Sequence, residues 1–138
     1  MDDTYQIKPI GFVRSTLKCV ETAPRQGNEG APEAWLEIKE EFIGGLHALP
    51  TGTDLFILTW LHQARRDVLH VHPRDDLNTP LTGVFATRSP HRPNPVGLHR
   101  VSVLEYAEYR LKVAPLEAID GTPVIDIKPV LRDNANIR

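Results

Sequence analysis

Apolar and polar residues alternate along several short segments of the chain, which is the pattern of β-strands with one buried face. The strongest of these segments is 55–61, a nearly continuous apolar run that predicts a strand lining a barrel or buried on both faces. It is followed directly by two polar residues, His62 and Gln63. The other predicted strands span residues 6–14, 34–38, 68–72, 84–87, 98–104, 110–118 and 124–129.

The segments between these strands contain little helix. Residues 40–49 have the apolar spacing of one or two helical turns, but Gly44 and Gly45 weaken the pattern and Pro50 ends it. Residues 15–31 read as a long loop. Successive strands without intervening helices argue against an α/β sheet. We therefore predict one all-β domain over residues 1–138, a small closed β-barrel of about seven or eight strands with one or two short helical turns.

The segment 83–99 combines rigidity with polar side chains. Its three prolines fix their own φ angles and favour extended conformations at the residues before them, so the segment is a stiff loop. A rigid loop loses little conformational entropy when it binds a ligand. Within seven residues it carries five polar groups suited to ligand recognition, namely Arg88, Ser89, His91, Arg92 and Asn94. The alternative interpretation is a surface turn with solvated arginines.

Charge is unevenly distributed along the chain. The 138 residues carry a formal net charge of −2, which argues against a general polyanion binder. Between Trp60 and Arg100, however, six arginines face three acidic residues, and five of the six histidines lie there. This local excess of positive charge suits an anionic ligand or a limited contact with nucleic acid.

The remaining composition predicts a cytoplasmic protein. The single cysteine, Cys19, excludes an internal disulfide and fits a reducing compartment. The acidic N-terminus lacks a signal-peptide pattern, and no apolar run approaches the roughly 18 residues of a membrane helix. We expect no membrane association.

Common catalytic and nucleotide-binding motifs are absent from the sequence. It has no glycine-rich dinucleotide or phosphate loop and no nucleophile elbow. His62, His70 and His72 allow a metal-binding alternative, but no carboxylate or cysteine pair at a ligand spacing supports it. We expect no metal site. Asp126 and Lys128 face the same way on the last predicted strand, either as an exposed ion pair or as an acid or base at the barrel mouth.

Five blocks of the sequence resemble the YaeB-like (TsaA-like, TrmO) family, in the same order and across nearly the whole chain. The resemblance implies a β-barrel that binds S-adenosylmethionine without a Rossmann domain. It also implies a homodimer with the cofactor near the subunit interface. The matching blocks are residues 10–15, 24–26, 58–63, 83–97 and 120–129.

The family resemblance implies an activity and a set of site residues. The characterised reaction is methylation of N6 of threonylcarbamoyladenosine, next to the anticodon of threonine-accepting tRNAs. The predicted proton acceptor is Asp126 or His62, and the predicted substrate contacts are Arg25, Asn94 and Lys128. The family's cofactor contacts map onto Gln26, Gly27, His62, Gln63, Arg88, Arg92, Ala118, Ile119, Asp120, Gly121 and Thr122.

Simple chemistry is compatible with this assignment. Arg88 or Arg92 has the fork geometry that pairs with the methionine carboxylate, and the other arginine is available for the carboxylate of the substrate. Methyl transfer from a sulfonium requires in-line positioning and removal of one proton from the accepting nitrogen. The alternative is a regulatory module that binds S-adenosylmethionine without catalysis.

Overall fold

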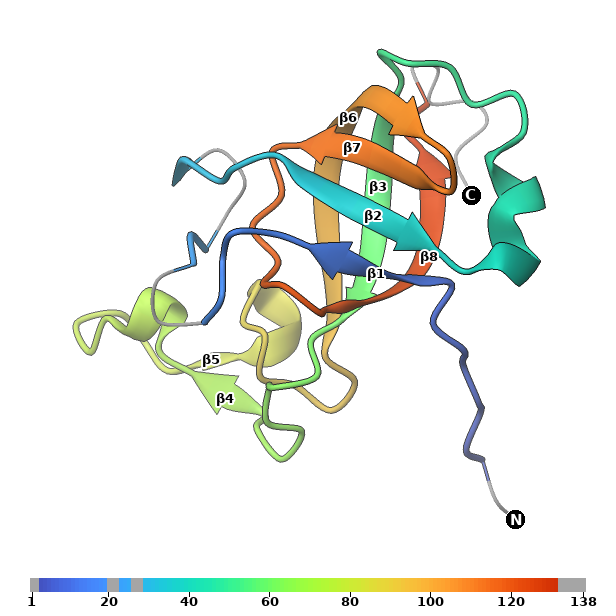
Figure 1. The fold of residues 1–138 in the computed structure, drawn as a ribbon. Helices are drawn as coiled ribbons and strands as arrows, with labels where there is room; N and C mark the ends of the chain where they lie inside the picture. The colour runs from blue at the N-terminus through green and yellow to red at the C-terminus, as the bar shows by residue number, and fades with distance from the viewer. Residues whose placement is uncertain (1–2, 20–22, 26–28, 132–138) are drawn as a thin grey trace.

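A closed six-stranded β-barrel forms the body of the molecule (Figure 1). The computed structural model describes residues 3–19, 23–25 and 29–131. All neighbouring strands are antiparallel, and their order around the barrel is β1–β2–β7–β6–β3–β8. The strands are β1 (Gly11–Arg14), β2 (Ala34–Ile38), β3 (Asp54–Trp60), β6 (Val96–Ala107), β7 (Arg110–Ala114) and β8 (Pro123–Pro129).

The all-β barrel prediction is confirmed. Of the eight strands in the described residues, six close the barrel, a division that the sequence pattern did not show. Two further strands, β4 (His70–Val71) and β5 (Thr82–Gly83), pair with each other outside the barrel. They belong to the long connection between β3 and β6 (Figure 1). Three short 3₁₀ helices lie in the described residues: η3 (Glu40–Leu46), η4 (Pro73–Asp75) and η5 (Val84–Ala86).

The core fills the interior of the barrel with aliphatic side chains from every strand. In β3, buried and partly exposed positions alternate, so Leu55, Ile57 and Thr59 point inward. This pattern corresponds to a strand that lines a barrel, which is one of the two alternatives predicted for this segment. Val101 and Val103 of β6 face the same interior. Each fully buried aliphatic side chain of this kind stabilises the fold by roughly 1.5–3 kcal/mol.

The predicted strand over residues 84–87 is wrong. Residues Val84–Ala86 form the helix η5 instead, with Val84 buried and Phe85 exposed at 84%. The short apolar run was compatible with a strand or with a helical turn, because only one of its residues reaches the core. The strand predicted from residue 98 begins earlier, at Val96, directly after the third proline.

The antiparallel order gathers three connections at one end of the barrel. The strands β1, β3 and β7 end there, and β2, β6 and β8 begin there. The segments 15–33, 61–95 and 115–122 therefore meet at what we call the loop end. The helix η3 and the β6–β7 turn belong to the opposite end. No helix in the ranges that the structure describes is long and apolar enough to cross a membrane.

Candidate functional site

The turn that follows β3 is fastened to the proline-rich segment before β6. The amide of Leu61 donates to the carbonyl of Pro95 at 2.8 Å. The guanidinium of Arg66 donates from Nε to the carbonyl of Pro93 at 2.7 Å and from Nη2 to Oδ1 of Asn94 at 2.9 Å. Asn94, a predicted substrate contact, is thus held by a side chain of the opposite segment. Two stretches that the sequence predicted to be functional are joined into one unit.

His62 and Gln63 lie at the tip of this turn with exposed side chains. The turn itself is stabilised by the amide of Ala64, which donates to the carbonyl of Leu61 at 2.9 Å. His91 is fixed beside it, because its Nδ1 accepts a hydrogen bond of 3.0 Å from the amide of Arg65. The two predicted contact residues at the tip are therefore carried by a rigid base.

Arg92 organises the helix η5. Its Nη2 donates to the carbonyl of Thr87 at 2.7 Å and also to the carbonyl of Val84. Its Nε is buried and has no hydrogen-bond partner among the residues that the structure describes. Arg88 differs, since its side chain is exposed and makes no hydrogen bond or ion pair within the described part of the chain. One arginine is thus partly used by the fold, whereas the other is available.

The turn 118–122 connects to β1 through Asp120. Its Oδ1 accepts a hydrogen bond of 3.0 Å from the amide of Ser15, and its Oδ2 lies 3.2 Å from Nζ of Lys18. The backbone hydrogen bond, and secondarily the ammonium group, hold the pKa of Asp120 below its usual value. Gly121 has a φ of +84°, which favours glycine. Ala118, Ile119 and Thr122 are buried, so their side chains support the turn.

The loop before β2 reaches the β4–β5 excursion through two ion pairs. Nη2 of Arg25 lies 2.8 Å from Oδ2 of Asp75, and Nη2 of Arg74 lies 2.6 Å from Oε1 of Glu29. The arginine beside it lowers the pKa of Asp75. Arg25, a predicted substrate contact, therefore lies at the loop end. The predicted cofactor contacts Gln26 and Gly27 lie outside the described residues.

Asp126 and Lys128 form an ion pair on the outer face of β8. Their charged atoms are 3.4 Å apart, and their side chains are 48% and 57% exposed. In the register they lie opposite Leu58 and Phe56, along the wall of the barrel rather than after the end of β3, where His62 follows. The structure thus shows an exposed ion pair, and the role of Asp126 as a proton acceptor stays a prediction.

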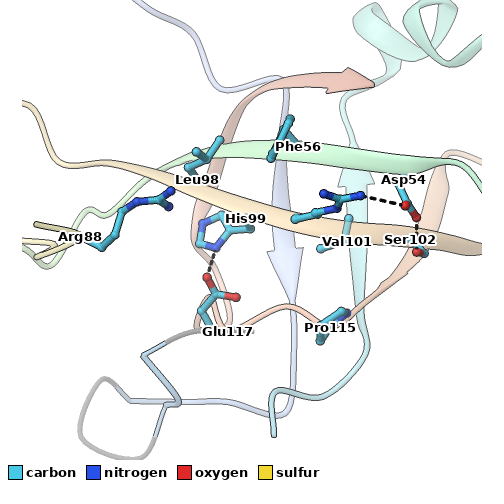
Figure 2. A pocket seen from close by; sticks show the side chains of 10 residues that line it. Asp54, Phe56, Arg88, Leu98, His99, Val101, Ser102, Pro115 and Glu117 are labelled. Carbon is cyan, nitrogen blue, oxygen red and sulfur yellow. Dashed lines mark hydrogen bonds and ion pairs between the residues drawn. The ribbon is translucent and has the colours of Figure 1, made fainter. Parts of the chain in front are cut away.

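A cleft of about 550 Å³ opens beside β6 (Figure 2). In the close-up view, Arg88, His99 and Glu117 lie toward one end of it, and Asp54 and Ser102 toward the other. Charged and apolar side chains alternate along its walls. The lining residues are Asp54, Phe56, Arg88, Leu98, His99, Arg100, Val101, Ser102, Pro115 and Glu117.

His99 is the central member of a hydrogen-bonded chain of side chains at this cleft. Its Nε2 lies 2.7 Å from Oγ1 of Thr59, and its Nδ1 lies 2.5 Å from Oε1 of Glu117. Thr59 is fully buried and His99 is 5% exposed. A carboxylate only accepts hydrogen bonds, so Nδ1 of His99 donates to Glu117, and in the neutral imidazole Nε2 accepts the hydroxyl proton of Thr59. Burial and these two hydrogen bonds hold the three side chains in one arrangement.

The sequence matches the tRNA-methyltransferase O N-terminal domain family over residues 12–134. The chain belongs to this family. The match covers both walls of the cleft and every strand of the barrel except the first residue of β1. The family resemblance drawn from the five sequence blocks is therefore confirmed.

Relatives of this N-terminal domain bear names that refer to ligand binding. A "probable S-adenosyl-L-methionine-binding protein" of Methanothermobacter thermautotrophicus is 45% identical over 132 residues, covering 96% of this chain and 94% of that protein. An "S-adenosyl-L-methionine-binding protein" of Archaeoglobus fulgidus is 46% identical over 122 residues, covering 88% of this chain and 86% of the other.

A solved structure shows the same architecture. The crystal structure of TrmO from P. aeruginosa superimposes with a TM-score of 0.75 at 31% identity. The likeness covers 100% of this chain and 61% of that protein, so this chain spans about three fifths of the TrmO chain. The barrel with its loop end is thus the N-terminal domain architecture of TrmO.

The hydrogen-bonded side chains of Thr59, His99 and Glu117 are the part of this TrmO-type domain that was not predicted from the sequence. Thr59 and His99 are polar residues at positions where strand alternation points inward, and Glu117 interrupts an apolar run. Polar residues at inward positions require hydrogen-bond partners, so their presence in the sequence could have indicated a buried polar network. Their pairing arises only when β3, β6 and the segment after β7 come together.

The histidines considered for a metal do not assemble in this domain. In the ranges covered by the structure, no group of three or more histidine, cysteine, aspartate or glutamate side chains is arranged to hold a metal ion. His70 is exposed on β4, and Nδ1 of His72 lies 2.9 Å from the carbonyl oxygen of Thr79.

Proposed function

We propose that this chain is an S-adenosylmethionine-dependent methyltransferase that acts on N6 of threonylcarbamoyladenosine in tRNA. The predicted cofactor agrees with relatives that are named S-adenosyl-L-methionine-binding proteins. The structural observation that carries the proposal is the pair of arginines at the loop end. Arg92 keeps a buried, unpartnered Nε among the described residues, and Arg88 lines the cleft without a partner there.

The residues present fit a ligand with a carboxylate. A buried guanidinium N–H without an acceptor is costly, and a carboxylate of the cofactor's methionine part satisfies it with a charge-assisted hydrogen bond. Arg92 is the residue that we assign to this contact. The turn 118–122 and the tip of the turn 61–66 supply further polar groups, including those of His62, Gln63 and Asp120. When bound, S-adenosylmethionine supplies an electrophilic methyl group.

The acceptor is assigned to the same end of the barrel. Between Trp60 and Arg100 the chain carries six arginines and three acidic residues, which favours an RNA backbone or a carboxylate. Arg25 and Asn94 lie on the segments that border the cofactor residues, and both are held by hydrogen bonds. We assign Arg25, Asn94 and the more distant Lys128 to contacts with the nucleic acid.

The decisive experiment is a methyl-transfer assay with labelled S-adenosylmethionine and two tRNAs. One tRNA carries threonylcarbamoyladenosine, and the control is the same transcript without this modification. We expect label in the modified tRNA only. Binding of S-adenosylmethionine in calorimetry without any transfer would support the regulatory alternative. Absence of cofactor binding at millimolar ligand would contradict both functions.

We further propose that the protein is a cytoplasmic homodimer with the cofactor near the subunit interface. Four strongly exposed apolar side chains lie within residues 69–85, beside the loop end. Large exposed apolar side chains gathered on one segment are candidates for a protein interface. They are Leu69 (57% exposed), Leu77 (80%), Leu81 (60%) and Phe85 (84%).

A further inference from the structure

The cleft lies where β7 separates from β6. Residues 102–107 of β6 pair with β7, whereas its first half, from Val96 to Val101, pairs only with β3. After Ala114 the chain turns away from β6 and passes Pro115 and Glu117 along the other side of the gap. The gap between the first half of β6 and the segment after β7 therefore forms the cleft, and His99 and Glu117 line it.

Glu117 presents a carboxylate to this opening. Its Oε1 accepts the hydrogen bond from Nδ1 of His99, and its side chain is 14% exposed. Its Oε2 has no hydrogen-bond partner among the residues described by the structure. In Figure 2 this second oxygen lies on the side of Glu117 that faces Pro115. A carboxylate that is oriented by one oxygen and open at the other is arranged to accept a proton from a ligand.

The orientation of Glu117 is fixed by residues deeper in the barrel. The imidazole of His99 donates to it from Nδ1 and accepts from the buried hydroxyl of Thr59 at Nε2. Gly97 leaves the room for this arrangement, because a Cβ at that position would lie 2.3 Å from Oγ1 of Thr59 and 2.7 Å from Nε2 of His99. The carboxylate is therefore preorganised rather than one of several rotamers.

The rest of the cleft suits a carboxylate-bearing adenine nucleoside. Its volume of about 550 Å³ lies in the usual range for small-molecule sites. Phe56, Leu98 and Pro115 are apolar lining residues that offer contacts to a base, and the unpaired guanidinium of Arg88 matches a carboxylate. The second arginine of the cleft, Arg100, is already paired with Asp54 at 3.3 Å. Arg88 is thus the available cation.

We propose that the cleft holds the methyl acceptor and that Glu117, positioned by His99, takes the proton that the acceptor nitrogen loses. This inference rests on the proposed function and names its acceptor site and its base. The nitrogen–carbon bond forms while the sulfur–carbon bond of the methyl donor breaks. The N–H bond breaks as well, its electron pair stays on nitrogen, and the proton passes to Oε2 of Glu117. The carboxylate becomes a carboxylic acid and later returns the proton to solvent.

The first test is binding of the free nucleoside N6-threonylcarbamoyladenosine to the full chain in the presence of S-adenosylhomocysteine, where no reaction occurs. We expect its addition to shift the NMR signals of the His99 imidazole. We expect Arg88→Ala to raise the dissociation constant by about tenfold or more, because a charge-assisted hydrogen bond is lost. Unshifted His99 signals, or equal binding by Arg88→Ala, would overturn the acceptor site even if tRNA is methylated.

The second test concerns the proton. Glu117→Gln keeps the hydrogen bond from His99 but removes the base, so kcat on modified tRNA should fall by about 10²–10⁴-fold. The dissociation constant of the nucleoside should stay within about threefold. The acid limb of the pH–rate profile should disappear in this variant, which a merely structural role would not cause. Glu105→Gln, an exposed carboxylate near the opposite end of β6, is the matched control and should behave as wild type.

The outcomes separate the two proposals. A folded Glu117→Gln protein that keeps wild-type kcat and pH dependence excludes Glu117 as the base, while the methyltransferase function stands. A wild-type chain that neither binds S-adenosylmethionine nor methylates tRNA contradicts the proposed function and removes Glu117's proposed reaction. Nucleoside binding at the His99 cleft would then still decide whether the site exists.

Discussion

Gly97 lies directly beneath the hydroxyl of Thr59, at the position opposite it in the β3–β6 register. A Cβ on residue 97 would come within 2.3 Å of Oγ1 of Thr59. The absence of a side chain at one residue thus permits the buried hydrogen bond between two others. This relationship links the glycine that ends the proline-rich segment to the side chains that line the cleft.

Gly97→Ala should therefore destabilise the protein. The added methyl group displaces Thr59 or His99 and leaves buried polar atoms poorly paired, so the free energy of unfolding should fall by roughly 1–3 kcal/mol. Urea denaturation measures the change. Gly83→Ala is the control, because its added Cβ meets only the carbonyl oxygen of Leu69, at 4.0 Å. Equal stability of Gly97→Ala and wild type would show that the Thr59–His99 pair tolerates displacement.

The acid dependence of stability should depend on Asp120. Its pKa in the folded protein lies below the ordinary value of 3.8, so the carboxylate form is favoured by folding. This stabilisation is fully present above the ordinary pKa and is lost as the pH falls through the lower folded-state pKa. Asp120→Asn should flatten the decline of unfolding free energy as the pH falls through and below the ordinary pKa of 3.8, measured by urea titrations at successive pH values.

Lys18→Met provides the matched comparison for Asp120. It removes the ammonium group 3.2 Å from Oδ2 but keeps the hydrogen bond from the amide of Ser15. Because that backbone hydrogen bond is the larger cause of the lowered pKa, Lys18→Met should flatten the acid decline less than Asp120→Asn does. Equal flattening by the two variants would mean that the ion pair, not the amide, sets the titration.

Alanine variants of Arg88 and Arg92 should differ in their effect on the melting temperature. Arg92→Ala frees the carbonyls of Val84 and Thr87, so it should lower the melting temperature as well as the affinity for S-adenosylmethionine. Loss of a charge-assisted hydrogen bond corresponds to about 1.5–3 kcal/mol of binding free energy. Arg88→Ala should leave the melting temperature unchanged, because its exposed side chain has no partner in the described part of the chain. Calorimetry and thermal unfolding on the same samples measure both effects, and an Arg92→Ala protein that binds the cofactor as wild type would refute its role.

The sequence predicted the barrel because its strands are short and follow one another without intervening helices. Val101 and Val103 could be assigned to one face from their spacing, whereas the nearly continuous apolar run of β3 did not distinguish the inward Leu55 and Ile57 from their neighbours. The short apolar run at Val84 could not be assigned to a strand or a helix, because a single buried residue is compatible with both the strand period and the helical period. Closure by six strands, with β4 and β5 outside, depends on pairings between distant segments.

The sequence predicted which segments form the candidate site, but it did not predict which side chains contact one another there. The loops that carry Arg88 and Asp120 were identified from proline, glycine and charge density, and the antiparallel order then gathers them at one end of the barrel. His99 and Glu117 were missed because they are 18 positions apart and on different elements. Their bond exists only because β7 leaves β6 at Ala114 and brings Glu117 back beside the barrel wall.

Phe85 should decide the oligomeric state. Its ring is 84% exposed on η5, although burying a phenylalanine from water stabilises a protein by roughly 1.5–3 kcal/mol. If residues 69–85 form the subunit interface, Phe85→Ser should convert a dimer to a monomer in analytical ultracentrifugation at micromolar concentration. Tyr5→Ser, which removes an 88% exposed aromatic ring before β1, is the control and should leave the mass unchanged. A wild-type protein that sediments as a monomer at all concentrations would exclude the homodimer, and a dimer unaffected by Phe85→Ser would place its interface elsewhere.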